Sequence, residues 1–153
     1  MGVTTQMAEC VGKWKGTKRL YLSWETDPIR QSESELTVSL KGRGQFVSFE
    51  YTWSYEGEPQ EGMILFGSDP KSTAAQSVWT DSWHSRDTLM VSNGNMNDDG
   101  SAEVKGYYKV EGYPEWGWRT LIVPENETLK VIMYNVSPEG DEELAVEAEY
   151  QRV

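Results

Sequence analysis

The segment VWTDSWHS, residues 78–85, combines the residue types that acid–base and nucleophilic catalysis use. It contains His84, the only histidine of the chain, together with Asp81 and Ser82. A histidine in this setting could act as a catalytic base, as a metal or haem ligand, or as a polar side chain in the wall of a pocket. The spacing of its neighbours separates these roles.

In a regular β-strand, successive side chains point to opposite faces. This alternation puts four residues on one face and three on the other: Val78, Thr80, Ser82 and His84 against Trp79, Asp81 and Trp83. Because Val78 is apolar, we predict that its face points inward and that His84 lies inside beside Thr80 and Ser82. Asp81 then cannot orient His84 unless a bulge intervenes, and no nucleophile-elbow sequence is present. A Ser-His-Asp hydrolase is therefore not indicated.

Metal binding also lacks the necessary side chains. One histidine and one cysteine, without carboxylates at ligand spacing, do not provide the ligands of a tetrahedral zinc site. The sequence predicts neither a metal site nor a cofactor.

Arg119, in the segment WGWRT at residues 116–120, is the candidate for binding an anion. If it pointed into a cavity, its planar guanidinium could hold a carboxylate or phosphate bidentately. Two other roles stay open. It could stack on a tryptophan, or it could pair with one of the 25 acidic residues, Asp81 among them.

The 153-residue chain has a formal net charge of −11. Such a charge repels nucleic-acid phosphates and anionic membrane surfaces, so we expect neither as a partner. Cys10, the only cysteine, cannot form an internal disulfide, and no secretory leader pattern opens the chain, so a cytoplasmic location is predicted. With no linker, repeat or break in composition, residues 1–153 are predicted to form a single domain.

Hydrophobic residues recur with a period of two between turn-forming clusters, which is typical of antiparallel strands. The pattern predicts about ten strands, at residues 12–24, 33–41, 44–56, 60–68, 74–84, 87–95, 101–110, 116–124, 127–137 and 141–152. A single helical turn is predicted around Thr5 to Val11. Because the links are short and closure removes exposed edges, we predict an all-β, antiparallel, up-and-down barrel.

Aromatic residues are numerous, with seven Trp, eight Tyr and three Phe. A barrel of about eight strands can hold one small ligand, so ten strands leave more space unless bulky side chains fill it. The side chains expected to line such a cavity are those on a predicted inward face of a strand and those next to tryptophans in the sequence. They are His84, Ser82, Thr80, Arg119, Tyr51, Trp53 and Tyr108.

Two segments at the ends of the chain resemble the signature of the calycins, which are lipocalin-like barrels. They are GKWKG, residues 12–16, and EYQRV, residues 149–153. The resemblance implies that Trp14, beside Gly12, closes the narrow end of the barrel beneath Arg152 of the last strand. An arginine over an indole contributes a cation–π contact of about 0.5–2 kcal/mol.

A wider resemblance covers nearly the whole chain. Four segments, YTWSYEGEPQEG (51–62), VWTDSWH (78–84), WGWR (116–119) and MYNVSPEGDEELAVEAEYQR (133–152), are together similar to a small bacterial family of unknown function with a calycin-like barrel. That resemblance implies a fold and a possible cavity, but no activity and no catalytic residue. Haem-binding barrels of the nitrobindin type are more distantly similar. Their haem ligand is a histidine near the C-terminal end, where this chain has none.

These observations favour a carrier or sensor for a small apolar or aromatic ligand with one polar or anionic end. Three alternatives stay open: an enzyme with His84 as acid or base and Arg119 as an anion clamp, a haem-binding barrel, and an interaction scaffold with a filled core. A homodimer is also expected if Trp79 and Trp83 are exposed at a barrel edge, because exposed tryptophans anchor interfaces.

Overall fold

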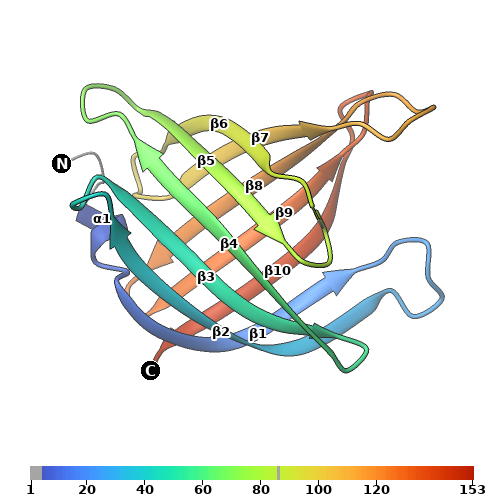
Figure 1. The fold of residues 1–153 in the computed structure, drawn as a ribbon, viewed down its shortest axis with the longest axis horizontal. Coiled ribbons are helices and arrows are strands. Elements are labelled where there is room, and N and C mark those ends of the chain that lie inside the picture. Colours follow the sequence, from blue (N-terminus) through green and yellow to red (C-terminus); the bar gives the residue numbers. More distant parts are fainter. Residues whose placement is uncertain (1–4, 86) are drawn as a thin grey trace.

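The computed structural model describes residues 5–85 and 87–153, and its ten antiparallel strands close into a barrel (Figure 1). The elements are α1 (Thr5–Ala8), β1 (Gly12–Tyr21), β2 (Ile29–Lys41), β3 (Phe46–Tyr55), β4 (Glu58–Ser68), β5 (Ala74–Asp81), β6 (Met90–Met96), β7 (Ala102–Tyr108), β8 (Trp116–Glu125), β9 (Thr128–Val136) and β10 (Glu142–Arg152). Each strand pairs with its neighbours in sequence, and β1 also pairs with β10. The predicted fold class, including the short N-terminal helical turn, is confirmed.

The period of two decides which side chains fill the barrel. In β3, Val47, Phe49 and Tyr51 are buried, whereas Glu50 and Thr52 on the other face are exposed. Packing against the other strands makes one continuous hydrophobic core. Inside this core the remaining cavity measures only about 20 Å³, so this part of the barrel is filled with side chains.

The alternation is interrupted once in β10. Leu144 pairs with Tyr134 of β9, and Val146 pairs with the adjacent Met133, so Ala145 is an extra residue in the ladder. A β-bulge of this kind shifts the phase of the strand by one residue. After the bulge, the even-numbered residues from Val146 on face the interior. Before Ala145 the order is reversed, and the odd-numbered residues face the interior.

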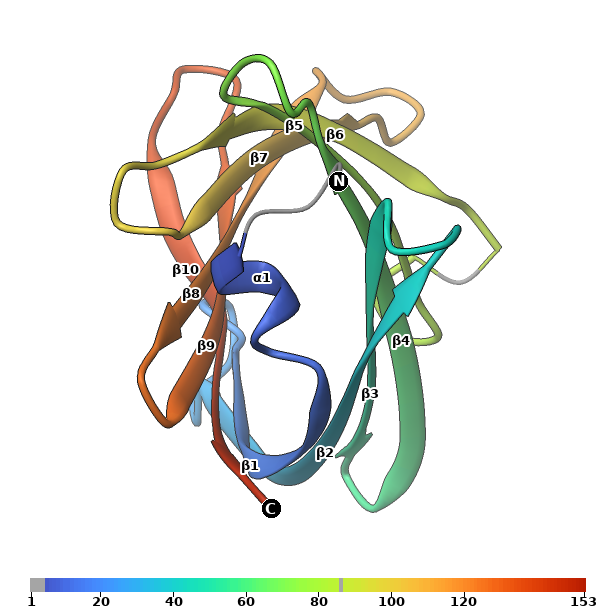
Figure 2. The same cartoon turned by 90° about the vertical axis from the view of Figure 1, so that its left-hand side faces the viewer.

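One end of the barrel is closed, and α1 lies across it (Figure 2). Trp14 is buried there, and its Nε1 donates to the carbonyl of Cys10 at 2.8 Å. The guanidinium of Arg152 lies 4.3 Å from the centroid of the Trp14 ring and donates to the carbonyls of Val11 and Glu9. This is the arrangement that the calycin resemblance implies.

Gly12 is required by the same contact. Its φ of 138° lies in the region that favours glycine, and a Cβ there would come within 2.9 Å of Nη1 of Arg152. A larger residue would therefore displace the guanidinium from the tryptophan.

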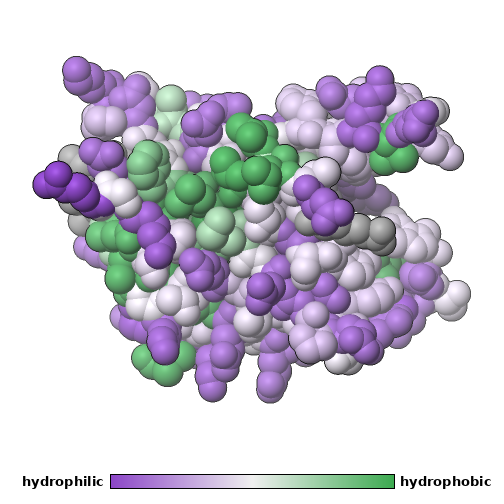
Figure 3. Space-filling model, in the orientation of Figure 1, coloured by the Kyte–Doolittle hydropathy of each residue, from purple (hydrophilic) through white to green (hydrophobic). Residues whose placement is uncertain are grey.

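The outer wall is largely hydrophilic, with a hydrophobic area over β4 and β5 (Figure 3). Leu65 and Val78 contribute to the wall in this region. Trp79 and Trp83, which were expected at an exposed barrel edge, do not contribute to the outer wall. Trp79 is buried in the core and Trp83 packs against that core, so the expectation of exposed indoles is wrong. Among the described residues, the only helix is far too short to cross a bilayer.

Candidate ligand-binding cavity

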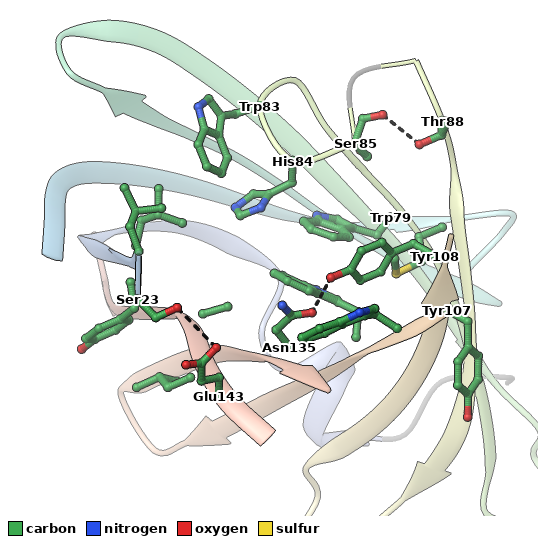
Figure 4. A pocket seen from close by; sticks show the side chains of 18 of the residues that line it. Ser23, Trp79, Trp83, His84, Ser85, Thr88, Tyr107, Tyr108, Asn135 and Glu143 are labelled. Atoms are coloured by element: carbon green, nitrogen blue, oxygen red, sulfur yellow. Dashed lines mark hydrogen bonds between the residues drawn. The ribbon is translucent and has the colours of Figure 1, made fainter. Parts of the chain in front are cut away.

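A cavity of about 680 Å³ opens at the end of the barrel opposite α1. Figure 4 shows side chains that line it. Aromatic side chains make up a large part of its wall, among them Trp79, Trp83, Tyr108, Trp116 and Trp118. Apart from His84, the only titratable charged groups among the described lining residues are Lys109 and Glu143. The interior of the cavity is thus apolar and aromatic, and full charges stand at its mouth.

His84 reaches the cavity from a turn rather than from a strand. β5 ends at Asp81, and the Oδ1 atom of Asp81 accepts the backbone N–H groups of Trp83 at 2.9 Å and His84 at 3.0 Å. The backbone N–H of Ser85 also donates to the carbonyl of Asp81. Asp81 therefore ends the strand, as aspartate side chains do in Asx-turns, and turns His84 inward.

The imidazole of His84 is enclosed by tryptophan rings. The centroids of Trp83, Trp79 and Trp118 lie 4.8, 5.4 and 5.5 Å from that of His84. Burial lowers the pKa of His84 to about 3, the positive charge of Lys18 adds to this effect, and Asp81 opposes it. The ring is therefore neutral near pH 7.

Two ring nitrogens at this wall are buried without a hydrogen-bond partner: Nε2 of His84 and Nε1 of Trp118. A buried polar group of this kind costs about 1–3 kcal/mol when it stays unpaired. Such groups are few in native proteins, and each calls for an explanation.

A buried polar network surrounds Asp81. The Oδ2 atom of Asp81 accepts the Tyr51 hydroxyl at 2.6 Å and the Trp53 Nε1 at 3.2 Å, and Trp79 Nε1 donates to the Tyr51 oxygen. Nζ of Lys18 lies 3.8 Å from the same carboxylate oxygen. Because donors converge on both oxygens of Asp81, this position requires a carboxylate, which accepts on both sides as an amide does not.

Lys18 is nearly inaccessible, with 3% of its surface exposed, and its Nζ lies 3.4 Å from the centroid of the Trp53 ring. Burial lowers the pKa of Lys18 to about 7, against the attraction of Asp81. Burial alone would raise the pKa of Asp81, but Lys18, His84 and the Tyr51 hydrogen bond outweigh it and lower that pKa. The sequence analysis did not identify Lys18. It lies four residues after Trp14 and two before Leu20, so along β1 its side chain points inward like theirs.

Two residues expected in the cavity lie outside it. Thr80 is on the outer wall, and Ser82 is exposed, with its hydroxyl donating to Oε1 of Gln60 at 2.6 Å. The prediction is wrong because Val78 does not face inward: the odd-numbered residues of β5 are the buried ones. Val78 belongs instead to the hydrophobic area of the outer wall.

Arg119 is likewise outside the cavity. Its guanidinium makes a bidentate pair with Glu142 at 2.7 and 2.9 Å, contacts Glu103 at 3.4 Å, and lies 4.5 Å from the centroid of the Tyr134 ring. The expected anion clamp and the expected pair with Asp81 are both wrong. The alternative of an acidic partner on the surface describes what the structure shows.

The other expected aromatic residues do face inward. Tyr108 lines the cavity, and its hydroxyl donates to Oδ1 of Asn135 at 2.6 Å (Figure 4). Tyr51 and Trp53 are buried in the network around Asp81 rather than in the cavity wall. Of the predicted set, only His84 and Tyr108 thus come together at the cavity.

Among the described residues, neither the haem ligand of the nitrobindin comparison nor a cluster of metal-ligating side chains is found. The haem histidine of the nitrobindin comparison would stand in the last strand, and β10 contains none. The single histidine of the chain has its Nε2 enclosed. Within residues 5–85 and 87–153, no three His, Cys, Asp or Glu side chains cluster so as to hold a metal ion.

None of the curated proteins matches this sequence significantly. One family model matches, described as "Protein of unknown function (DUF1579)", and it covers residues 4–152. That range includes the tryptophan at the closed end, the turn that carries His84 and every strand of the barrel. The chain therefore belongs to the DUF1579 family.

Proposed function

We propose that this protein binds a small, largely apolar or aromatic molecule in the cavity at the open end of the barrel, as a carrier or sensor. The observation that carries the proposal is the cavity itself, which is open on one side and walled by aromatic rings. Its volume of about 680 Å³ is within the range of about 300–1,000 Å³ that small-molecule sites occupy.

The distribution of packing supports a binding role over a purely structural one. One part of the barrel is filled, with only about 20 Å³ left, whereas the open end keeps its space. The unpartnered nitrogens of His84 and Trp118 stand in the wall of that space. A ligand or an ordered water that reached them would remove the cost of leaving them unpaired.

Catalysis in the same cavity has less support. With a pKa of about 3, His84 is a weak base near neutral pH. Arg119, the expected electrostatic partner, is held on the outer wall by Glu142.

We also propose a cytoplasmic location, with neither nucleic acid nor membrane as partner. The net charge of −11 supports the second part. Cys10 is the only cysteine and has no partner in the chain for a disulfide, which supports the first part. A homodimer stays a prediction, without the tryptophan contact that motivated it.

A titration with the neutral fluorescent probe N-phenyl-1-naphthylamine tests the binding proposal. We expect saturable binding of one probe per chain. His84→Gln keeps a donor and an acceptor and is expected to retain most of the affinity, whereas His84→Leu loses more. Thr80→Val, on the outer wall, is the matched control and is expected to leave binding unchanged.

Absence of saturable binding, or equal affinity in all three variants, would contradict the proposal. Native mass spectrometry of the purified protein then identifies any retained small molecule. A haem Soret band on the wild type that disappears in both His84 variants would instead make His84 an iron ligand.

A further inference from the structure

Glu143 is the acidic side chain that the structure brings to the mouth of the cavity (Figure 4). Its Oε2 accepts the hydroxyl of Ser23 at 3.4 Å, and it takes part in none of the ion pairs found among the described residues. The adjacent Glu142 is different, because Arg119 binds it bidentately on the outer wall. Among the described lining residues, Glu143 is the only carboxylate, and Lys109 is the only full positive charge in the same wall.

The bulge at Ala145 explains how Glu143 comes to line the cavity. In the phase set by Val146, Ala148 and Tyr150, an odd-numbered residue faces outward, as exposed Glu149 does. Because the bulge reverses that phase, Glu143 faces the cavity and Glu142 faces the outer wall. Bulges beside sites commonly re-aim a side chain in this way.

The links around the mouth strengthen the negative field. In sequence, the links at residues 22–28, 56–57, 82–89, 109–115 and 137–141 contain eight acidic residues. Asp27 and Glu56 both pair with Arg30, which leaves Glu25, Asp87, Glu111, Glu115, Glu139 and Asp141. In sequence, the basic residues of these links are Lys109, which lines the cavity, and Arg86, which lies outside the described residues. A mouth of one predominant sign concentrates ligands of the opposite charge.

An exposed indole also lines the cavity, one residue after the serine that contacts Glu143. Trp24 follows Ser23, lines the cavity, and is 74% exposed. Aromatic faces and carboxylates together are the groups that recognise ammonium ions in proteins. Deeper in the cavity the described wall offers rings, aliphatic groups and neutral dipoles such as Asn135.

We infer that the ligand of this cavity is a cationic amphiphile. Its hydrophobic or aromatic body lies among the tryptophan rings, and its protonated or quaternary amine stays at the mouth against Glu143 and Trp24. This inference rests on the proposed binding function and adds the sign and place of the ligand's charge. It replaces the anionic end that the sequence led us to expect from Arg119.

Three probes that share a naphthalene ring test the inference by isothermal titration calorimetry. They are the ammonium ion of 2-naphthylmethylamine, the alcohol 2-naphthalenemethanol and the carboxylate of 2-naphthaleneacetic acid. At low ionic strength we expect the ammonium to bind about tenfold more tightly than the carboxylate, with the alcohol in between. The difference should shrink as salt is added, because the contacts are exposed.

Charge-neutralising variants locate the effect. Glu143→Gln is expected to weaken binding of the ammonium about 3–5-fold and to leave the alcohol unchanged. Lys109→Gln should shift the ammonium affinity the opposite way. Glu149→Gln makes the same change in net charge on the outer wall of β10 and should have no such effect.

The outcomes separate this inference from the function on which it rests. If all three probes bind equally well, or if Glu143→Gln behaves like Glu149→Gln, the cavity binds apolar molecules but the inferred charge is wrong. If none of the probes binds, both proposals fail. Circular dichroism of each variant confirms that the barrel is intact.

Discussion

His84 makes the stability of the barrel depend on pH. In the unfolded chain its pKa returns to about 6.5, whereas in the native protein burial holds it at about 3. Between these values the unfolded state binds a proton that the native state does not. The free energy of unfolding therefore falls as the pH falls through this range.

We predict that His84→Gln removes this dependence. Between about pH 7 and pH 4.5 the wild type should lose about 2 kcal/mol more of its unfolding free energy than the variant, because glutamine does not titrate. Urea denaturation at several pH values measures both curves. Apart from Asp81, whose pKa His84 helps to lower, the carboxylates titrate alike in both proteins. Parallel curves would therefore mean that burial does not lower the pKa of His84 in the native protein.

At the scale of the elements, close approach of neighbouring strands decides where side chains are tolerated. Gly16 of β1 stands opposite Tyr150 of β10, and a Cβ on it would lie 1.8 Å from the carbonyl oxygen of Glu149. Gly117 of β8 is different, since a Cβ there meets the end of the flexible Lys105 side chain at 2.8 Å.

We predict that Gly16→Ala destabilises the barrel by about 1–3 kcal/mol, because the neighbouring backbone has to move. Gly117→Ala is the matched control and should change the unfolding free energy much less, because the lysine can turn away. Thermal or urea unfolding of the two variants measures the difference. Equal losses of unfolding free energy would show that the backbones of β1 and β10 can move apart at little cost.

Sequence patterns were sufficient for the strands and their order, because the period of two repeats in almost every segment. They were insufficient where a side chain ends a strand early or where an extra residue shifts the inward and outward alternation. Asp81 ends β5 by bonding the following backbone N–H groups, so His84 enters from a turn. The segment LAVEAEY alternates without a visible break, and the bulge at Ala145 that re-aims Glu143 follows from the pairing with β9.

Over the whole molecule, the two ends of the barrel have separate tasks. The closed end packs Trp14 beneath Arg152, and the open end keeps the cavity. Truncating a residue at one end should therefore affect stability without changing the affinity at the other.

We predict that Trp14→Ala costs about 3–5 kcal/mol, as is usual for a buried aromatic residue. Arg152→Ala should cost less, because the exposed guanidinium contributes about 0.5–2 kcal/mol by its contact with the ring. Denaturant unfolding gives both losses, and probe binding to the folded fraction should be unchanged. Small and equal losses would contradict the role of the tryptophan at the closed end.

The closure of the ring has a kinetic consequence. Every seam but one in the described barrel joins strands that are neighbours in sequence, whereas β1 meets β10 through contacts such as that of Arg152 with Val11, 141 residues apart. Closing so long a loop is slow compared with forming hairpins. Until that seam forms, the chain is an open sheet whose first and last strands offer unpaired N–H and C=O groups to other chains. The yield of folded protein therefore depends on how fast β1 pairs with β10. A high concentration of newly made chains favours edge-to-edge aggregates over closed barrels.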